Sequence, residues 1–265
     1  MNDTSVKTAR CVKGRRLVYY RSQVHDDFWD RHWENHLSTE MFKGAERGYL
    51  GWFEEPFTRY LPKDALILEA GCGPGKYLLA LRKRGYHAEG VELGAETVKS
   101  VKMLYPDLPI RVADAMRLNV PNDYYGAYVS LGVLEHCRQG PGLLLKESNR
   151  VLKPGGVAFF SVPYFHALRR FKAYLGFYRD QTDGLDFYQY AFTKQEFSSF
   201  LHHAGFTIID EMLYDGFKGV KDEMPLLLPI LRWKYIGWRF EKWLRSSEYV
   251  KGNLGHMILF ICRKD

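Results

Sequence analysis

The stretch Leu66-Ile67-Leu68-Glu69-Ala70-Gly71-Cys72-Gly73-Pro74-Gly75 decides the fold of this chain. An apolar run long enough for a buried parallel strand ends in an acidic residue, and a glycine-rich turn and a helix-like segment at 76–82 follow it. Glycines allow a tight turn and let a ligand approach where a Cβ would interfere. In an open α/β sheet, ligands bind at this place, outside the carboxyl end of the first strand.

The spacing of the glycines indicates which kind of ligand the turn accepts. A dinucleotide site reads G-x-G-x-x-G and directs a helix N-terminus at a pyrophosphate. Here the pattern is E-x-G-x-G-x-G, with Pro74 between the last two glycines and Glu69 two places before the first. A carboxylate beside the ligand favours a cationic ligand over a phosphate.

Two further strands are predicted to end in acids. In the segment 87–93 the predicted strand ends with Glu92, which stands nineteen residues after Gly73. An acid about twenty residues beyond the glycine turn is placed to accept hydrogen bonds from ribose hydroxyls. The segment 110–116 contains Asp114, which is either a ligand contact or a cap of the following turn.

Together with the turn at 152–156, Leu-Lys-Pro-Gly-Gly, these motifs resemble the class I S-adenosylmethionine-dependent methyltransferases. The chain looks most like the branch that contains the quinone-biosynthesis and other small-molecule enzymes. The resemblance covers roughly residues 60–215 and the last dozen. It implies that S-adenosyl-L-methionine is the cofactor, S-adenosyl-L-homocysteine its product, and that Asp114 and Ala115 contact the adenine. The expected cofactor-binding residues are Glu69, Gly71, Cys72, Gly73, Gly75, Glu92, Leu93, Asp114, Ala115, Leu131 and His136.

The run Val133-Leu134-Glu135-His136 follows the fourth predicted strand, 127–131, and resembles the loop that lines the methionine end of the cofactor. His136 is therefore a candidate general base as well as a packing residue. A polar residue followed by Pro-Pro-aromatic, typical of enzymes that methylate exocyclic amines or glutamine, is absent from this place. That absence favours another acceptor atom, most plausibly oxygen.

The remaining strands and helices alternate, which predicts an α/β, Rossmann-like, doubly wound sheet of seven strands. In the family the last strand, here 256–262, is antiparallel. We expect one methyltransferase domain over 61–265, preceded by an N-terminal helical cap at 1–60. Helical lid segments are expected as insertions at about 164–191 and 216–250.

The composition indicates a single domain and a cytoplasmic protein. The chain has 265 residues, of which 46% are hydrophobic, so it can bury one sizeable core. It contains neither an uninterrupted apolar run of about 18 residues nor a basic-then-apolar leader, which argues against a membrane span and a signal peptide. Its four cysteines show no C-x-x-C pair, which indicates a reducing compartment without structural disulfides or zinc.

The N-terminal cap is rich in aromatic residues, which favours packing against the body of the protein. The resemblance implies that such a cap also closes over cofactor and acceptor. His32 and His36 stand one helical turn apart, with His25 upstream, a spacing compatible with a metal. The neighbouring acids, among them Asp30 and Glu34, favour a solvated, salt-bridged helix face instead. We therefore expect no metal.

The insertion at 164–191 follows the fifth strand and should contact the acceptor, because insertions here do so in the family. Its Tyr and His residues can hydrogen-bond a hydroxyl and accept its proton, and its Arg residues can hold an anionic group. His166 is the first candidate for the base, ahead of His136, and Tyr164 or Tyr190 is expected to orient the acceptor. A lid that only packs is the alternative.

The segment 225–246 is basic and aromatic, with three tryptophans. It is predicted to be an acceptor-site wall or homodimer contact, a peripheral membrane helix, or a nucleic-acid contact, in falling order of preference. The formal net charge of +7 is spread along the chain and does not indicate nucleic acid.

The sequence thus predicts a cytoplasmic, or membrane-associated, S-adenosylmethionine-dependent methyltransferase. Its expected acceptor is a small aromatic, lipophilic or glycan-type metabolite, methylated at oxygen by in-line transfer. The alternatives are a tRNA-modifying methyltransferase and a peripheral-membrane methyltransferase of a lipid or quinone.

Overall fold

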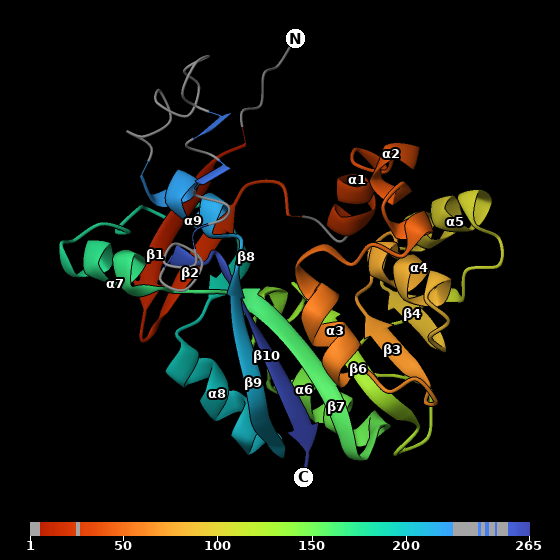
Figure 1. The fold of residues 1–265 in the computed structure, drawn as a ribbon. Helices are drawn as coiled ribbons and strands as arrows, with labels where there is room; N and C mark the ends of the chain where they lie inside the picture. Colours follow the sequence, from red (N-terminus) through yellow and green to blue (C-terminus); the bar gives the residue numbers. More distant parts are fainter. Residues whose placement is uncertain (1–5, 25–26, 225–237, 240–241, 244–246, 248–253) are drawn as a thin grey trace.

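A seven-stranded mixed sheet forms the centre of the computed structural model, which describes residues 6–24, 27–224, 238–239, 242–243, 247 and 254–265. The strand order is β5-β4-β3-β6-β7-β10-β9 (Figure 1). The strands are β3 (Ile67–Ala70), β4 (Ala88–Glu92), β5 (Ile110–Val112), β6 (Tyr125–Leu131), β7 (Leu152–Pro163), β9 (Phe206–Tyr214) and β10 (Met257–Lys264). Strand β10 is antiparallel to both β7 and β9, and β3 to β7 pair in parallel. The predicted Rossmann-like sheet is confirmed.

Alternate residues of the central strands enter two separate cores, because successive side chains of a strand point to opposite faces. Ile67 and Phe159 pack with α3 (Glu54–Tyr60), α4 (Lys76–Lys83) and α5 (Ala95–Leu104) on one face. Leu68 and Phe160 pack with α6 (Gly142–Val151) and α8 (Lys194–His203) on the other. Burial on both faces explains why Ile67 and Leu68, successive residues of β3, are both apolar.

A second, three-stranded antiparallel sheet has the order β1-β2-β8. It joins β1 (Thr8–Lys13) and β2 (Arg16–Arg21) from the N-terminus to β8 (Asp186–Ala191) from the insertion after β7. The expected N-terminal cap is therefore helical only in part. The run Leu17-Val18-Tyr19-Tyr20 is rich in β-branched and aromatic residues and pairs with β8, so it forms a strand rather than a helix.

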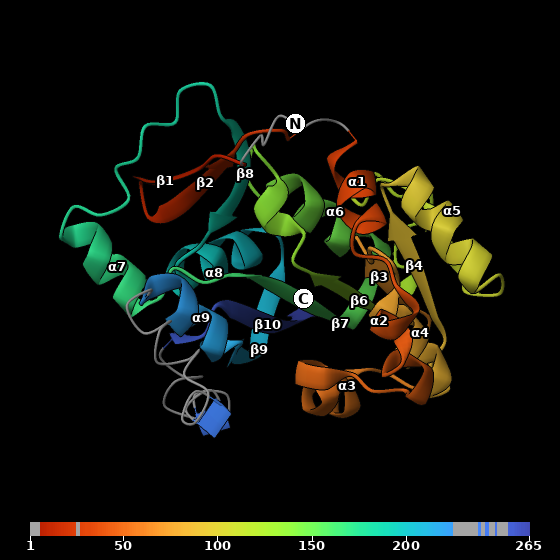
Figure 2. The same cartoon turned by 90° about the horizontal axis from the view of Figure 1, so that it is seen from above.

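The helical part of the N-terminal segment comprises α1 (Phe28–Glu34), α2 (Thr39–Phe42) and two short 3₁₀ turns at Ala45–Arg47 and Gly51–Phe53. In Figures 1 and 2, α1 and α2 lie beside α4 and α5 at one end of the molecule. At the opposite end lie the second sheet, α7 (Ala167–Tyr174) and α9 (Gly216–Glu223). A 3₁₀ turn at Leu134–His136 follows β6.

The segment 225–246, predicted to be amphipathic, falls outside the described residues except for 238–239 and 242–243. Trp238 and Trp243 are both exposed. Within the part of the chain that the structure describes, no helix is both long and apolar enough to cross a bilayer.

Candidate cofactor and acceptor site

The glycine turn after β3 adopts a backbone that other residues rarely take. Gly71, Gly73 and Gly75 all have positive φ angles, of 70°, 53° and 75°. A Cβ on Gly71 would lie 2.5 Å from Cγ2 of Val133, and one on Gly73 would lie 2.7 Å from the Trp33 ring. The turn therefore needs glycine for its conformation and for the close approach of its neighbours.

Glu92, the last residue of β4, joins this turn to the end of the second parallel strand. Its Oε2 accepts a hydrogen bond from the Gly73 amide at 2.8 Å, and its Oε1 accepts from the amides of Leu93 and Gly94 at 2.9 and 3.1 Å. All three donors are backbone groups, so the carboxylate is fixed without a neighbouring cation. A carboxylate oxygen has two lone pairs, which leaves Oε2 able to accept a further bond.

A cavity of about 330 Å³ lies above these strand ends. Its walls include every predicted cofactor-binding residue except Gly75, together with three side chains of the N-terminal segment. The predicted residues are Glu69, Gly71, Cys72, Gly73, Glu92, Leu93, Asp114, Ala115, Leu131 and His136, and the added ones are Trp29, Trp33 and Met41. The structure thus brings together side chains from four strand ends, as expected for a doubly wound sheet.

Glu69 is the least compensated carboxyl in the cavity wall. The residue is 4% exposed, and its Oε2 has no hydrogen-bond partner among the described residues. Burial raises the pKa of Glu69 to about 8; the Leu78 amide lowers it in part and the nearby Glu92 raises it further. A buried carboxyl with a free oxygen is suited to a cationic ligand, which would restore the missing partner.

Helix α1 covers the glycine turn, and a contact that the sequence analysis missed ties it there. Oδ1 of Asp30 accepts hydrogen bonds from the Thr97 amide and from the Thr97 hydroxyl, both at 2.9 Å. Thr97 lies in the first turn of α5, just after Glu92. In the sequence, Asp30 is an acid within an aromatic helical segment, and this pattern does not indicate that its partner is Thr97, 67 residues away.

His136 lies in an aromatic enclosure at the cavity wall. Its Nδ1 lies 2.8 Å from the Tyr188 carbonyl oxygen, and its ring centroid lies 4.7 Å from that of Trp29. Because a carbonyl only accepts, Nδ1 carries the proton and Nε2 is the acceptor, with Oε1 of Glu135 4.0 Å away. Burial lowers the pKa of His136 to about 4, so the ring is neutral at physiological pH.

Two predicted catalytic residues are not brought to this cavity. His166 is completely buried at the start of α7, and neither ring nitrogen has a hydrogen-bond partner among the described residues. Burial and then the Arg169 charge lower its pKa to about 3. Tyr164 lines a separate groove beside α7 and α8. His136 alone of the three candidates lines the cavity.

The histidines considered for metal binding give no metal site in the described residues. His32 and His36 stack with ring centroids 4.5 Å apart, and Nδ1 of His36 bonds the His32 carbonyl. No group of three ligating side chains occurs within 6–24, 27–224 and the shorter described stretches, and His25 lies outside them.

Comparison with known proteins agrees with this geometry. Residues 68–160 match the family model described as "Methyltransferase domain". Over 97 residues the chain is 32% identical to a Mycolicibacterium smegmatis protein named "Probable S-adenosylmethionine-dependent methyltransferase", covering 37% of each chain. It is 31% identical over 110 residues to the tRNA (carboxymethyluridine(34)-5-O)-methyltransferase of Arabidopsis thaliana, covering 40% of this chain and 26% of that one. With the ubiquinone biosynthesis O-methyltransferase of Coxiella burnetii it shares 28% over 124 residues, 43% of this chain and 48% of the other.

The chain thus spans between about a quarter and half of the length of these curated relatives. Among solved structures, it is similar to the complex between the Haloferax volcanii Trm112 methyltransferase activator and a methyltransferase. The TM-score is 0.60 at 17% identity, with 91% of this chain and 97% of that chain covered. At this identity the likeness shows the fold alone.

Proposed function

Because residues 68–160 belong to the class I S-adenosylmethionine-dependent methyltransferases, we propose that this protein transfers a methyl group to a hydroxyl oxygen of a small-molecule acceptor. One observation carries the proposal: a single cavity is lined by the glycine turn, by Glu69, Glu92 and Asp114, and by a neutral histidine.

The residues around the cavity fit S-adenosylmethionine. The glycine turn leaves open the space that a Cβ would fill, and Glu69 keeps an unpartnered oxygen for a cationic group. We assign ribose recognition to Glu92 and adenine contact to Asp114 and Ala115. Asp114 also caps its own turn, since its Oδ1 accepts from the Met116 amide at 2.8 Å, so its Oδ2 is the atom offered to a ligand.

The cofactor, when bound, supplies an electrophilic methyl group on a sulfonium. The protein's task is then to hold an acceptor atom in line, and positioning of this kind can contribute roughly 7–11 kcal/mol. Trp33 and the Asp30–Thr97 contact keep α1 over the cavity and exclude water. Nε2 of His136 accepts the hydroxyl proton, while the Tyr188 carbonyl keeps the other ring nitrogen protonated.

The walls favour an acceptor with a flat apolar part. Trp29, Trp33 and Met41 line the cavity from the N-terminal segment, and Tyr77 of α4 lines it as well. The Coxiella burnetii relative, whose name specifies O-methylation in ubiquinone biosynthesis, supports oxygen on a lipophilic metabolite. The Arabidopsis thaliana relative supports tRNA modification as the second candidate.

The first experiment identifies the acceptor class. The protein is incubated with methyl-labelled S-adenosylmethionine and a cell extract, and label is counted in organic-soluble, polar small-molecule, RNA and protein fractions. Glu92→Ala serves as the blank, since loss of its charged hydrogen bonds should weaken S-adenosylhomocysteine binding about 10- to 150-fold. Label in a small-molecule fraction supports the proposal, and label confined to RNA or protein overturns it.

A second experiment tests His136. We expect His136→Gln to lower kcat by about 10²–10⁴-fold while S-adenosylhomocysteine affinity changes little, because a positioned base contributes about that much. His203→Gln, on the exposed face of α8, is the matched control. An unchanged kcat in His136→Gln would remove the base role and leave His136 as a packing residue.

A further inference from the structure

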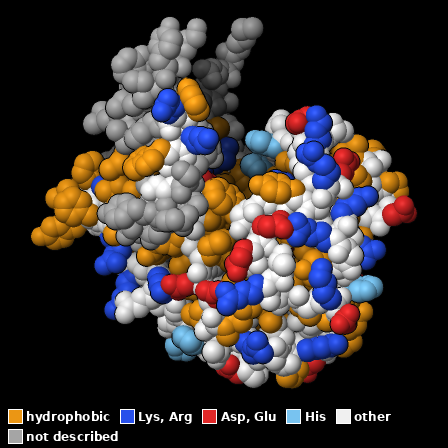
Figure 3. All heavy atoms as spheres, viewed as in Figure 1, with side chains coloured by type: hydrophobic (Ala, Val, Ile, Leu, Met, Phe, Trp, Pro, Cys, Tyr) orange, Lys and Arg blue, Asp and Glu red, His pale blue; other side chains and the backbone are white. Residues whose placement is uncertain are grey.

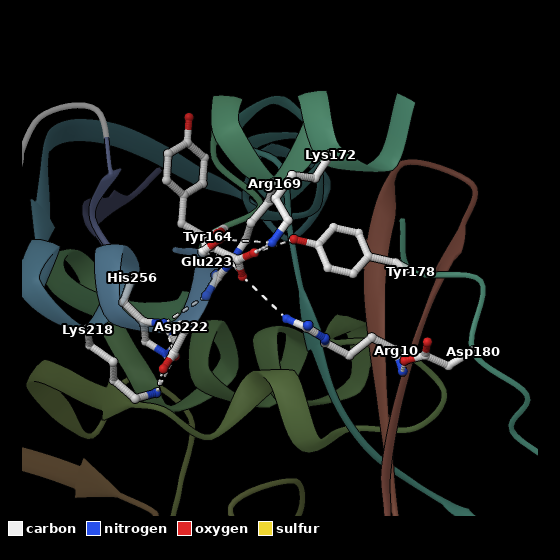
Figure 4. Close-up of polar contacts among 10 residues, drawn as sticks. All are labelled: Arg10, Tyr164, Arg169, Lys172, Tyr178, Asp180, Lys218, Asp222, Glu223 and His256. Atoms are coloured by element: carbon white, nitrogen blue, oxygen red, sulfur yellow. Dashed lines mark hydrogen bonds and ion pairs between the residues drawn. The ribbon is translucent and has the colours of Figure 1, made fainter. Parts of the chain in front are cut away.

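Helix α7 has two of its three charged side chains, Arg169 and Lys172, inside and its large apolar side chains outside, which is unusual for a surface helix. Arg169 is fully buried, and Lys172 points to the same interior side. Nε of Arg169 donates to Oε1 of Glu223 at 2.9 Å, and Nζ of Lys172 donates to Oε2 at 2.8 Å. Figure 4 shows these side chains converging on the Glu223 carboxylate.

The Glu223 carboxylate holds this unusual orientation through four donors. Besides Arg169 and Lys172 it accepts from the Tyr178 hydroxyl and lies 3.4 Å from Nη1 of Arg10. Burial on its own raises the pKa of Glu223, but Lys172, Tyr178 and Arg169 together hold it at about 2. The carboxylate is thus charged at physiological pH and fastens α7 to α9 and to strand β1.

The outer face of α7 and the residues just after it form an apolar patch, which we call the α7 patch: Phe171, Tyr174, Leu175 and Phe177. These side chains are 58%, 86%, 56% and 55% exposed. Phe171, Tyr174 and Leu175 lie three and four positions apart, so they share one helix face. The patch projects from the side of the molecule that α7 occupies (Figure 3). A patch of several large neighbouring apolar residues indicates an interaction site.

Cations without acidic partners border the α7 patch. The stretch from Tyr164 to Arg179 contains no Asp or Glu, and two of its four cations, Arg170 and Arg179, form no ion pair within the described part of the chain. Beside it, a groove of about 1020 Å³ runs between the β1–β2 turn, α7 and α8. The groove is lined by Arg15, Arg170 and Lys194, with no acid among the described lining residues; Lys194 pairs with Glu211 outside the groove, whereas Arg15 and Arg170 form no ion pair with any described residue.

We propose that the α7 patch and the adjoining groove dock the protein on an anionic lipid bilayer. The α7 patch enters the boundary between headgroups and acyl chains, and Arg15 and Arg170 contact lipid phosphates. The α7 patch matches the apolar interior of such a membrane, and the cations of the groove match its negatively charged surface. An RNA would use the cations and can stack its bases on aromatic rings, but it offers no apolar interior for the aliphatic Leu175.

Vesicle flotation of the full chain tests this surface. It requires no methyl transfer, so a negative result would contradict the docking proposal and leave the proposed function unaffected. Vesicles of phosphatidylcholine alone are compared with equal parts of phosphatidylcholine and phosphatidylglycerol. We expect the wild type to float with the anionic vesicles. Phe171→Ser/Leu175→Ser should lower the partition coefficient by roughly tenfold or more, because two large apolar contacts are lost.

Matched controls separate the surface from general effects. Met103→Ser/Leu143→Ser removes two equally exposed apolar side chains elsewhere and should leave flotation unchanged. Arg15→Gln/Arg170→Gln should abolish the preference for anionic vesicles, whereas Arg82→Gln/Lys83→Gln on α4 should keep it. Circular dichroism confirms that each variant is folded.

Four outcomes would overturn the proposal. The wild type fails to float, or Phe171→Ser/Leu175→Ser floats as well as the wild type. Alternatively, sedimentation shows that the wild type is a dimer which the same substitutions dissociate, so that the α7 patch binds a second copy. Binding of a short RNA that Arg15→Gln/Arg170→Gln removes, without any flotation, would assign the groove to nucleic acid instead.

Discussion

The two ends of the molecule use buried glutamates in opposite ways. At the cavity end, Glu92 is held by three backbone amides, and Glu69 keeps an oxygen without a partner among the described residues. At the α7 end, Glu223 receives four side-chain donors, three of them cationic. The same side chain therefore has a pKa of about 8 as Glu69 and about 2 as Glu223.

The difference separates binding from scaffolding. Backbone amides fix a carboxylate while leaving lone pairs and free volume, so the cavity end stays ready for a ligand. A carboxylate surrounded by Arg, Lys and Tyr donors has no such capacity left. Its effect is to hold three segments of the chain together and to keep α7 facing outward.

Breaking the α7 end should have the largest effect. Glu223→Ala leaves Arg169 buried without its partner, and removing one member of a buried ion pair typically lowers the free energy of unfolding by about 3–5 kcal/mol. Urea denaturation measures the loss. The control is Glu96→Ala, whose partner Lys99 is exposed, and it should change stability by no more than about 0.5 kcal/mol. A loss below about 1 kcal/mol for Glu223→Ala would show that the ion pairs do not hold this end.

The cavity end should respond to pH through Glu69. The carboxyl is protonated below pH 8, and a cationic ligand binds its ionised form better, so binding releases a proton. S-adenosylmethionine affinity should therefore rise with pH between about 6 and 8, by up to about tenfold per pH unit. Titration calorimetry across this range measures the slope.

Two variants isolate the source of that slope. Glu69→Gln should remove the part of the slope that is due to the Glu69 carboxyl. The titration of the ligand's own amino group affects both proteins equally, so it cancels when the slope of the variant is subtracted from that of the wild type. Glu135→Gln is the control, because it alters a second buried carboxyl that does not line the cavity. Burial raises the pKa of Glu135 to about 8 as well. An unchanged slope in Glu69→Gln would contradict the assignment of Glu69 to the cationic ligand.

The same contrast explains what the sequence could predict. The cavity end follows from local rules, since parallel strands end at one edge and place Glu69, Glu92 and Asp114 together. The α7 end depends on contacts between distant parts of the chain, such as Arg10 with Glu223 or β2 with β8. No periodicity encodes those partners. His166 and Tyr164 were expected at the cavity because they follow β7, but α7 turns away to pack on α9 and the second sheet.

Asp30 joins α1 to α5 at the cavity end through its side chain, and its removal should have the smallest effect. Asp30→Ala loses two hydrogen bonds to Thr97, while the rings of Trp33 and Phe28 still pack. We expect S-adenosylhomocysteine to bind roughly fivefold more weakly, about 1 kcal/mol, because α1 covers the glycine turn less of the time. Hydrogen exchange in residues 28–34 should accelerate in parallel. Asp30→Asn retains the Oδ1 acceptor and should recover most of the affinity, and Glu34→Ala, exposed on the same helix, should have no effect. Faster exchange with unchanged affinity would mean that α1 covers the cavity without contributing to cofactor binding.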